Sequence, residues 1–337
     1  MSVALYRSPH LNLLQAKKDA SSFRVLVLIG VAVACCAASF LPRMTKSSVA
    51  SKLAEANHPV ACLPQWVPVL LAANTVSSQE RLVYNRIGKA GSSFMISTLA
   101  ALSKTNHFTL ENHANFWPSK AVLAQELGRS LRSDTVYVNH ANFLNGTASD
   151  LKWINVVREP IARWSSLFYY DVDVSLRGEK AVHALALRAK DTQCGCAGLE
   201  FYECIRVRCS HNCTLKIPSQ ISSFCERDER CSRVLATARL HASYLLVGLT
   251  EELEMTLKVM EKMLPRFFRG ATNMSTKGSP RATALTNQLT HTSLTGAIPD
   301  ETRKLIQAHA VNYMDEHLFY EDTKTLFWHR ACEHSVI

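Results

Sequence analysis

The sequence predicts an α/β fold in which a P-loop-like parallel sheet is flanked by helices and follows an N-terminal membrane anchor. From residue 81 onward, short apolar segments alternate with amphipathic ones, which is the pattern of strands alternating with helices. A glycine-containing turn joins the first of these strands to a helix, and an uncharged apolar segment lies ahead of the whole region at residues 25–41.

The composition of the 337 residues is that of a folded, basic protein. Hydrophobic residues make up 47% and charged residues 20%, which excludes collagen-like, low-complexity and disordered chains. Lys and Arg number 38 against 28 Asp and Glu, so the formal net charge is +10. Such a surplus favours a polyanionic partner: nucleic acid, anionic lipid, a nucleotide or a sulfated glycan.

Residues 25–41 (VLVLIGVAVACCAASFL) carry no charge over 17 residues, which is at the short end for a helix that spans a bilayer. A cleaved signal peptide is the alternative, but the 24-residue polar lead-in favours an uncleaved anchor. The distribution of Lys and Arg points slightly to a cytoplasmic N-terminus. We therefore expect a tail at 1–24, an anchor at 25–41, a stem at 42–80 and a luminal domain at 81–337.

Nine of the eleven cysteines lie beyond the predicted anchor, and seven of them fall between residues 194 and 231. This density predicts disulfide-linked loops in an oxidising compartment. Zinc is the alternative, with ligands drawn from Cys194, Cys196, Cys204, Cys209 or His211, but no C-x2-C pair occurs there. Because nine is odd, one thiol at least is expected to be free or to pair between chains. Sequons at Asn145, Asn212 and Asn273 fit such a compartment.

The secondary structure of the domain follows from its apolar patterns. Strands are expected at residues 81–85, 135–138, 153–157 and 244–247. Helices are expected at 92–104, from Pro160 to about Tyr170, after a cap at Thr250, and from Asp300 to about His317. A cysteine-rich insert at 190–231 and a Ser/Thr-rich loop at 272–298 separate them.

The turn at residues 84–93 (YNRIGKAGSS) is the first motif that can carry chemistry. It places a lysine between two glycines and two serines at a helix start: Gly88, Lys89, Gly91, Ser92 and Ser93. Backbone N–H groups at a helix start bind phosphate or sulfate oxygens, and the lysine adds positive charge near a leaving phosphate. It is not a Walker A loop, because Ala90 follows the lysine and the usual magnesium ligand is missing. An ordinary glycine turn is the structural alternative.

Residues 154–166 (INVVREPIARWSS) form the second motif. A hydrophobic strand delivers Arg158 to its carboxyl end, where open α/β sheets bind ligands, and a proline-initiated helix follows. Arg158 can bind a phosphate with two hydrogen bonds, and Ser166 lies two helical turns further on. The alternative is an arginine that caps a neighbouring helix.

His140 lies just past the strand at 135–138, with Asn139 between them. It is a candidate general base because an imidazole titrates near neutrality. One histidine among 13 is weak evidence by itself. Asn139 and Asn142 could orient the ring or the substrate, or could be turn residues.

Together these motifs resemble the Golgi sulfotransferases that use 3′-phosphoadenosine-5′-phosphosulfate (PAPS). The resemblance is strongest to the uronic-acid 2-O-sulfotransferases, which include the heparan sulfate 2-O-sulfotransferase and the dermatan/chondroitin uronyl 2-sulfotransferase. It covers about residues 81–275 and rests on VYNRIGK (83–89), HANFLN (140–145), INVVREPI (154–161), the Phe224–Cys231 segment, and LVGLTEEL with LPRFFRGA (246–271).

The resemblance implies a PAPS site with no metal. Arg86 and Lys89 would hold the 5′-phosphosulfate, while the segment Ala90, Gly91, Ser92 and Ser93 would supply backbone and hydroxyl donors. Arg158 and Ser166 would hold the 3′-phosphate, and His140 would take the proton from a sugar 2-hydroxyl. The resemblance also implies disulfides Cys225–Cys231 and Cys204–Cys213, with the remaining cysteines free to change the pairing.

Two departures from the family pattern leave the acceptor open. The heparan sulfate enzyme has a second histidine two residues before its base, where this chain has Val138. Its aromatic-Arg-Phe-Gly segment, which touches the acceptor, is replaced here by YYDVDV at residues 169–174, with two acids and no arginine.

The expected function is therefore sulfuryl transfer from PAPS to the 2-hydroxyl of a uronic acid in a glycosaminoglycan. The alternatives are a P-loop kinase or NTPase, for which no magnesium ligand is evident, and a non-enzymatic membrane-tethered protein that binds heparin or another polyanion. The expected partners are a glycosaminoglycan chain and the Golgi membrane, through one N-terminal helix in a type II topology. No nucleic acid is expected, and a homo-oligomer stays open.

Overall fold

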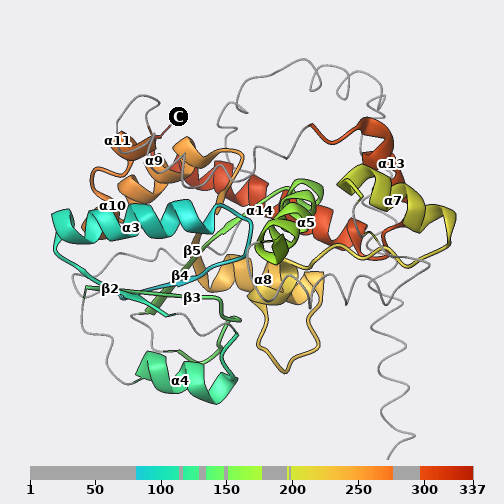
Figure 1. Ribbon diagram of the computed structural model, residues 1–337. Coiled ribbons are helices and arrows are strands. Elements are labelled where there is room, and N and C mark those ends of the chain that lie inside the picture. Colours follow the sequence, from blue (N-terminus) through green and yellow to red (C-terminus); the bar gives the residue numbers. More distant parts are fainter. Residues whose placement is uncertain are drawn as a thin grey trace, which may run out of the picture. The chain divides into compact units, whose positions relative to one another are not determined.

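The computed structural model describes residues 81–113, 117–128, 134–147, 151–176, 196, 199–275 and 297–336, all within the unit Cys62–Ile337 (Figure 1). The predicted tail, anchor and stem lie outside these ranges and stay predictions. None of the helices in the described ranges is long and apolar enough to cross a membrane.

A five-stranded parallel sheet forms the centre of the fold, in the order β2-β3-β1-β4-β5. Its strands are β1 (Arg81–Asn85), β2 (Thr109–Asn112), β3 (Thr135–Asn139), β4 (Leu151–Val157) and β5 (Tyr244–Leu249). The predicted parallel α/β fold and its four predicted strands are confirmed. β2 was not predicted because it lies at the sheet edge and has no fully buried residue, so its four residues carry no apolar alternation.

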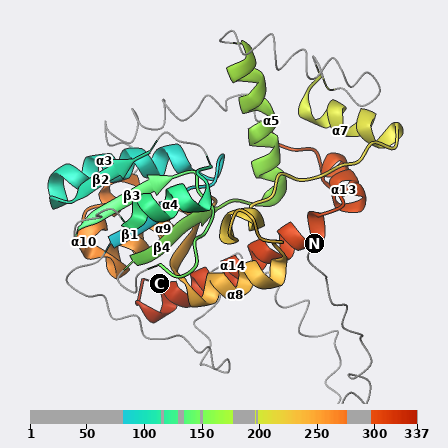
Figure 2. The same ribbon diagram turned by 90° about the horizontal axis from the view of Figure 1, so that it is seen from below.

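Helices cover both sides of the sheet, and Figure 1 shows α3 and α4 on opposite sides of the strands. On one side lie α3 (Ser92–Asn106), α9 (Leu253–Met263), α10 (Pro265–Phe268) and α11 (Thr272–Ser275). The others are α4 (Lys120–Gly128), α5 (Pro160–Leu176), α7 (Phe201–Ser210), η1 (Ile221–Phe224), α8 (Arg233–Ala242), α13 (Asp300–His309) and α14 (Tyr313–Glu333). Both α8 and α14 pack on β5 and lie side by side (Figure 2).

Two apolar clusters hold these layers together. The larger surrounds the sheet and includes the fully buried Trp153 and Phe319. The smaller joins α5, α7 and α13 through residues such as Ile161, Phe201 and Ile306, so the segment after α5 has a core of its own.

A buried polar cluster links β1, β4 and β5 next to the turn that follows β1. Asn155 Nδ2 donates to the backbone oxygen of Asn85 at 2.7 Å, and the Asn85 side chain is bonded to Tyr244 Oη at 2.9 Å. Asn85 Nδ2 also donates to the Ser223 oxygen at 2.9 Å. Since buried amides are costly without partners, this cluster fixes the carboxyl end of β1 relative to β4 and to the first residue of β5.

Two helix predictions were wrong in their boundaries. Thr250 does not cap α9, because its hydroxyl donates to the Val157 oxygen at 2.9 Å and Glu252 takes the N-cap position. The last predicted helix is two helices, α13 and α14. Ala310 leaves the helical conformation with ψ 119° and pairs with Leu215 as an isolated parallel bridge, so the chain breaks there.

The predicted disulfides are confirmed in one case and wrong in the other. Cys225 is bonded to Cys231, but Cys204 is bonded to Cys196, with Cα atoms 5.0 Å apart, and not to Cys213. Cys204 lies in the first turn of α7 and Cys213 follows its end, and a rigid helix rising about 1.5 Å per residue separates them. Cys213 and Cys332 each take part in a disulfide as well, with partners outside the described residues, and Cys209 is a free thiol. Cys196 and Cys204 are therefore not zinc ligands here.

Gly248 in β5 has no room for a side chain. A Cβ there would lie 2.2 Å from Thr256 Cγ2, and Thr256 cannot move because its hydroxyl bonds both the N–H and the oxygen of Leu249. We expect Gly248→Ala to lower the free energy of unfolding by about 1–3 kcal/mol. Gly128→Ala, which meets no atom within 4 Å, is the matched control. Urea unfolding of both variants measures the difference, and equal midpoints would contradict this packing.

Candidate active site

Three loops meet at the carboxyl edge of the sheet. The segment after β1 begins at Arg86, the segment after β3 begins at His140, and the segment after β4 begins at Arg158. Asn85 and Asn139 are paired in register, so the first two loops leave the sheet side by side. This edge is where ligands bind in open parallel sheets, and the predicted site residues other than Ser166 gather there.

The Arg86–Gly91 turn has an unusual backbone. Its first N–H donates to the Asn139 oxygen at 2.9 Å, which ties it to the end of β3. Lys89 has φ 65° and Gly91 has φ 71°, both in the left-handed region. That conformation is free for Gly91 but costs free energy at Lys89, which has a Cβ. The turn therefore needs contacts that hold Lys89 in place.

Two guanidinium groups supply these contacts. Arg163 Nε donates to the Gly88 oxygen at 2.9 Å, and Arg158 Nη1 donates to the Lys89 oxygen at 3.3 Å. Arg163 also donates through Nη1 to the Pro218 oxygen at 2.6 Å. We call Arg158 and Arg163 the arginine clamp, because they bond successive carbonyl oxygens of the turn.

Sequence reasoning assigned Arg158 to a ligand and gave Arg163 no role. Arg163 lies in the first turns of α5 and is only 7% exposed, which is rare for an arginine without a structural partner. Its spacing of five residues from Arg158 places both side chains near the start of α5, which was the available signal. The partner oxygens on Gly88 and Pro218 are distant in sequence and could not be inferred.

A buried carboxylate supports the arginine clamp from the C-terminal helix α14. Burial lowers the pKa of Arg163 to about 10, and the nearby Glu316 carboxylate opposes that shift. Glu316 also accepts a hydrogen bond from the Gln220 N–H at 2.9 Å. The Gln220 side chain in turn bonds the N–H and the oxygen of Arg158 at 2.9 and 2.7 Å. Arg163 thus stays charged at neutral pH. Glu316 and Gln220 hold the two arginines on the side away from the turn.

The N-terminus of α3 faces the same edge as an anion-binding helix start. Gly91 is the N-cap and offers no side-chain cap, and the N–H groups of Ser92 and Ser93 donate to no backbone oxygen of the described residues. Such N–H groups and the helix dipole favour a bound anion. Ala90 is fully buried and its N–H donates to the Ile87 oxygen at 3.4 Å, so it contributes mainly to packing.

Positive side chains surround this helix start. The Lys89 ammonium lies over the ring of Tyr170 on α5, 4.3 Å from its centroid. Arg86 is half-buried, and burial lowers its pKa. Its Nε atom is buried without a hydrogen-bond partner among the described residues. Unsatisfied buried donors call for an explanation, and a bound anion would satisfy this one.

Ser166 lies further along α5 than the rest of the site. It is 1% exposed, and its Oγ has no hydrogen-bond partner in the described part of the chain. No described contact joins Ser166 to the Arg86–Gly91 turn. A helical serine normally bonds the carbonyl four residues earlier or points to solvent, and this one does neither.

His140 lies against the turn, and one hydrogen bond shows which nitrogen of its ring carries the proton. Its Nδ1 is 3.0 Å from the Arg86 oxygen, and because a carbonyl oxygen only accepts, Nδ1 carries the proton in the neutral ring. Nε2 is then the basic nitrogen, as a general base requires. A Cβ at Gly88 would lie 3.9 Å from His140 Cε1, so the ring lies close to the residue before Lys89.

Burial is the main cause of the low basicity of His140, and the positive charge of Arg86 adds to it. Together they lower the pKa of His140 to about 4. The ring is therefore neutral and able to accept a proton at any pH well above that value. Asn139 and Asn142 do not orient the ring: Asn139 Nδ2 donates to Tyr137 Oη, and Asn142 Nδ2 to the Ser222 oxygen.

The described residues contain no group of three or more His, Cys, Asp and Glu side chains that could hold a metal ion. The site that they do form combines positive donors with one neutral imidazole. It can bind an anionic ligand and accept one proton beside it.

Comparisons with known proteins agree with this geometry. The model of the sulfotransferase family matches residues 74–321. The chain is 25% identical to uronyl 2-sulfotransferase of Mus musculus over 257 residues, 72% of this chain and 61% of that protein. It is 30% identical to heparan sulfate 2-O-sulfotransferase 1 of Xenopus laevis over 218 residues, 58% of each chain. The chain thus spans about six tenths of the length of these relatives, and the resemblance to uronic-acid 2-O-sulfotransferases is confirmed.

The neutral state of His140 can be measured directly. We expect its ring carbon and proton shifts to stay constant as pH falls from 7 to 5, because burial and Arg86 keep the pKa near 4. NMR titration of the full chain measures this, with the signal assigned by its loss in His140→Gln. A midpoint near 6.5, the ordinary value for a histidine, would mean that the ring is solvated and separate from Arg86.

Proposed function

This chain belongs to the sulfotransferase family, and from that premise we propose that it transfers a sulfuryl group from PAPS to the 2-hydroxyl of a uronic acid in a glycosaminoglycan. The observation that carries the proposal is the neutral His140, held beside a lysine-containing turn at the start of a helix. The names of the relatives supply the acceptor class: uronyl 2-sulfotransferase and heparan sulfate 2-O-sulfotransferase.

The residues present fit a donor with phosphate groups. Lys89, Arg86 and the N–H groups of Ser92 and Ser93 would hold the 5′-phosphosulfate, and the buried unpartnered Nε of Arg86 supports this assignment. Arg158 and Ser166 would hold the 3′-phosphate, supported by the buried unpartnered Ser166 Oγ. The donor supplies the sulfuryl group and leaves as 3′-phosphoadenosine-5′-phosphate (PAP).

The chain's own residues would then do three things. Nε2 of His140 accepts the proton of the sugar hydroxyl as its oxygen bonds to sulfur. The bond from sulfur to the 5′-phosphate oxygen breaks, and the Lys89 ammonium stabilises the negative charge that develops on that oxygen. The arginine clamp holds the turn that carries Lys89, and the Arg86 oxygen of the same turn bonds His140. Lys89 and His140 therefore keep one arrangement, and the reacting groups need not be ordered again at each turnover.

The compartment and the membrane attachment belong to the same proposal. We place the domain in the lumen of the Golgi, behind a type II anchor at residues 25–41. The disulfides Cys196–Cys204 and Cys225–Cys231 support an oxidising lumen, where such bonds form and persist.

The direct test is sulfuryl transfer by the full chain. Radiolabelled PAPS is incubated with desulfated heparan, chondroitin and dermatan chains, which are then digested to disaccharides. Label at C2 of a uronic acid supports the proposal and names the polymer. PAP binding without transfer to any chain supports instead the non-enzymatic polyanion-binding protein, and the absence of PAP binding would remove the donor site.

His140→Gln separates the enzyme from that non-enzymatic protein. We expect turnover to fall by about 10²–10⁴-fold, because glutamine can bond the Arg86 oxygen but cannot accept the proton. PAP affinity, measured by calorimetry, should stay within about threefold of wild type, since His140 does not carry the donor charge. A variant that keeps most of its turnover would exclude His140 as the base.

Arg163→Lys tests the arginine clamp. A lysine cannot reach both the Gly88 and the Pro218 oxygens, so Lys89 loses part of what holds its left-handed conformation. We expect the Kd of PAP to rise about tenfold, which corresponds to about 1.4 kcal/mol. Arg206→Lys on α7 is the matched control. Unchanged PAP affinity in Arg163→Lys would show that the turn keeps its shape without the clamp.

A further inference from the structure

Trp117 is an exposed tryptophan beside the proposed base. It is 41% exposed, and its ring centroid lies 6.1 Å from that of His140 with the two planes inclined by 38°. Trp153, by contrast, is 1% exposed. A large apolar ring left in water next to a reacting group is informative, because tryptophans are highly buried on average.

The backbone of Trp117 is held in a costly conformation. Its φ of 57° lies in the left-handed region, which is uncommon for a residue with a bulky side chain. Its N–H donates to the His140 oxygen at 2.8 Å, and its oxygen accepts from the guanidinium of Arg227. Residues with a strained backbone that neighbouring hydrogen bonds hold in place cluster at binding sites. One of the two hydrogen bonds that hold Trp117 is accepted by the backbone of His140 itself.

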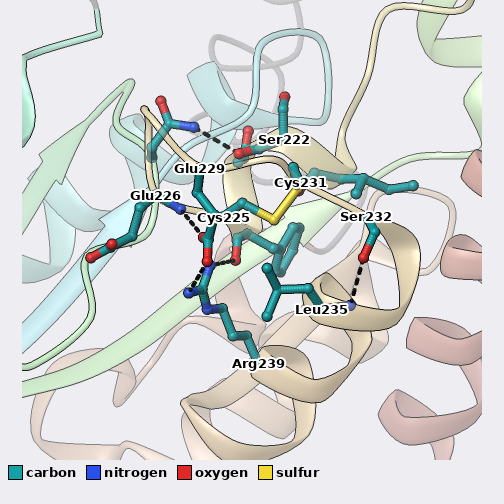
Figure 3. The surroundings of a disulfide bond; sticks show 12 residues. Ser222, Cys225, Glu226, Glu229, Cys231, Ser232, Leu235 and Arg239 are labelled. Carbon is teal, nitrogen blue, oxygen red and sulfur yellow. Dashed lines mark hydrogen bonds and ion pairs between the residues drawn. A yellow bond between two sulfur atoms is a disulfide. The ribbon is translucent and has the colours of Figure 1, made fainter. Parts of the chain in front are cut away.

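The disulfide loop Cys225–Cys231 supplies this support from outside the sheet (Figure 3). Arg227 belongs to that loop, and the neighbouring Glu226 carboxylate accepts from Lys120 Nζ at 2.8 Å and from the Asn145 N–H at 2.9 Å. The loop therefore bonds both the segment that carries Trp117 and the segment that follows His140. Its far end is fixed to α8 by the Glu229–Arg239 ion pair, also drawn in Figure 3.

The chemistry of this position fits a sugar ring. An indole presents a broad, flat, electron-rich face, and the C–H groups on one side of a pyranose ring form a matching flat surface with slight positive charge. Tyr170, the exposed aromatic on the other side of the site, already has the Lys89 ammonium over its ring. Among the described residues, the Trp117 face is thus an exposed aromatic surface beside His140 that a sugar can cover.

We propose that Trp117 is the stacking platform for a pyranose ring of the acceptor chain, which sets the 2-hydroxyl of the reacting sugar against His140. This inference rests on the proposed function for the identity of the chain that stacks. The alternative occupant, an apolar side chain of a partner protein, would leave oligosaccharide affinity independent of Trp117.

The test measures binding of labelled octasaccharides from desulfated heparan, chondroitin and dermatan to the full chain saturated with PAP. We expect Trp117→Leu to raise the Kd about tenfold and Trp117→Phe less than threefold, because phenylalanine keeps an aromatic face. Neither variant adds backbone strain, since tryptophan already adopts φ 57° there. Tyr202→Ala, on α7 and 38% exposed, is the matched control and should leave the Kd unchanged.

Salt dependence separates stacking from charge. The wild-type Kd should rise with salt because a basic protein binds a polyanion, but the ratio of Trp117→Leu to wild type should be the same at 50 and 300 mM NaCl. Equal affinities of wild type and Trp117→Leu would overturn the proposal, as would the absence of oligosaccharide binding to wild type. Binding that depends on Trp117 without any sulfuryl transfer would uphold the platform and reject the proposed enzyme.

Discussion

Two arginine side chains that bond successive carbonyl oxygens of one turn are the contacts on which the rest of the site depends. Arg163 on Gly88 and Arg158 on Lys89 fix a turn that would otherwise relax. The left-handed conformation of Lys89 costs about 1–2 kcal/mol, and hydrogen bonds to a charged group contribute about 1.5–3 kcal/mol each, so the clamp can hold it. Once the turn is fixed, the start of α3 is open to an anion and the Arg86 oxygen is in place to orient His140.

The free-energy cost of burying the arginine clamp is offset by a residue far along the chain, on α14. Burying the Arg163 guanidinium is unfavourable unless a counter-charge lies nearby, and α14 brings Glu316 to it. The same carboxylate holds Gln220, which bonds the backbone of Arg158 on both sides. The C-terminal helix therefore supports the proposed donor site from a distance. The disulfide loop Cys225–Cys231 supports the segment around His140 in the same way.

The local features of the fold were predictable and the long-range ones were not. Buried strands, the glycine turn and the proline-started α5 are encoded within a few neighbouring residues, and so were the positions of Lys89, His140 and Arg158. The partners of Arg163 lie 55 and 75 residues away in the sequence, and no short motif reveals them. The Cys204–Cys213 pairing that the resemblance implied was wrong because α7 separates the two cysteines, and Cys204 pairs with Cys196. Trp117 carried no signal because its importance comes from His140, which it meets only in the folded chain.

We propose that one clamped turn and one neutral histidine form a single site for an anionic donor with two phosphate groups and for an acceptor hydroxyl. An experimental structure of the full chain with bound PAP tests it most directly. We expect the 5′-phosphate at Lys89 and the N–H groups of Ser92 and Ser93, the 3′-phosphate at Arg158 and Ser166, and Arg163 still bonded to the Gly88 oxygen. PAP bound elsewhere, or a turn that has released Arg163 and moved away from His140, would contradict it.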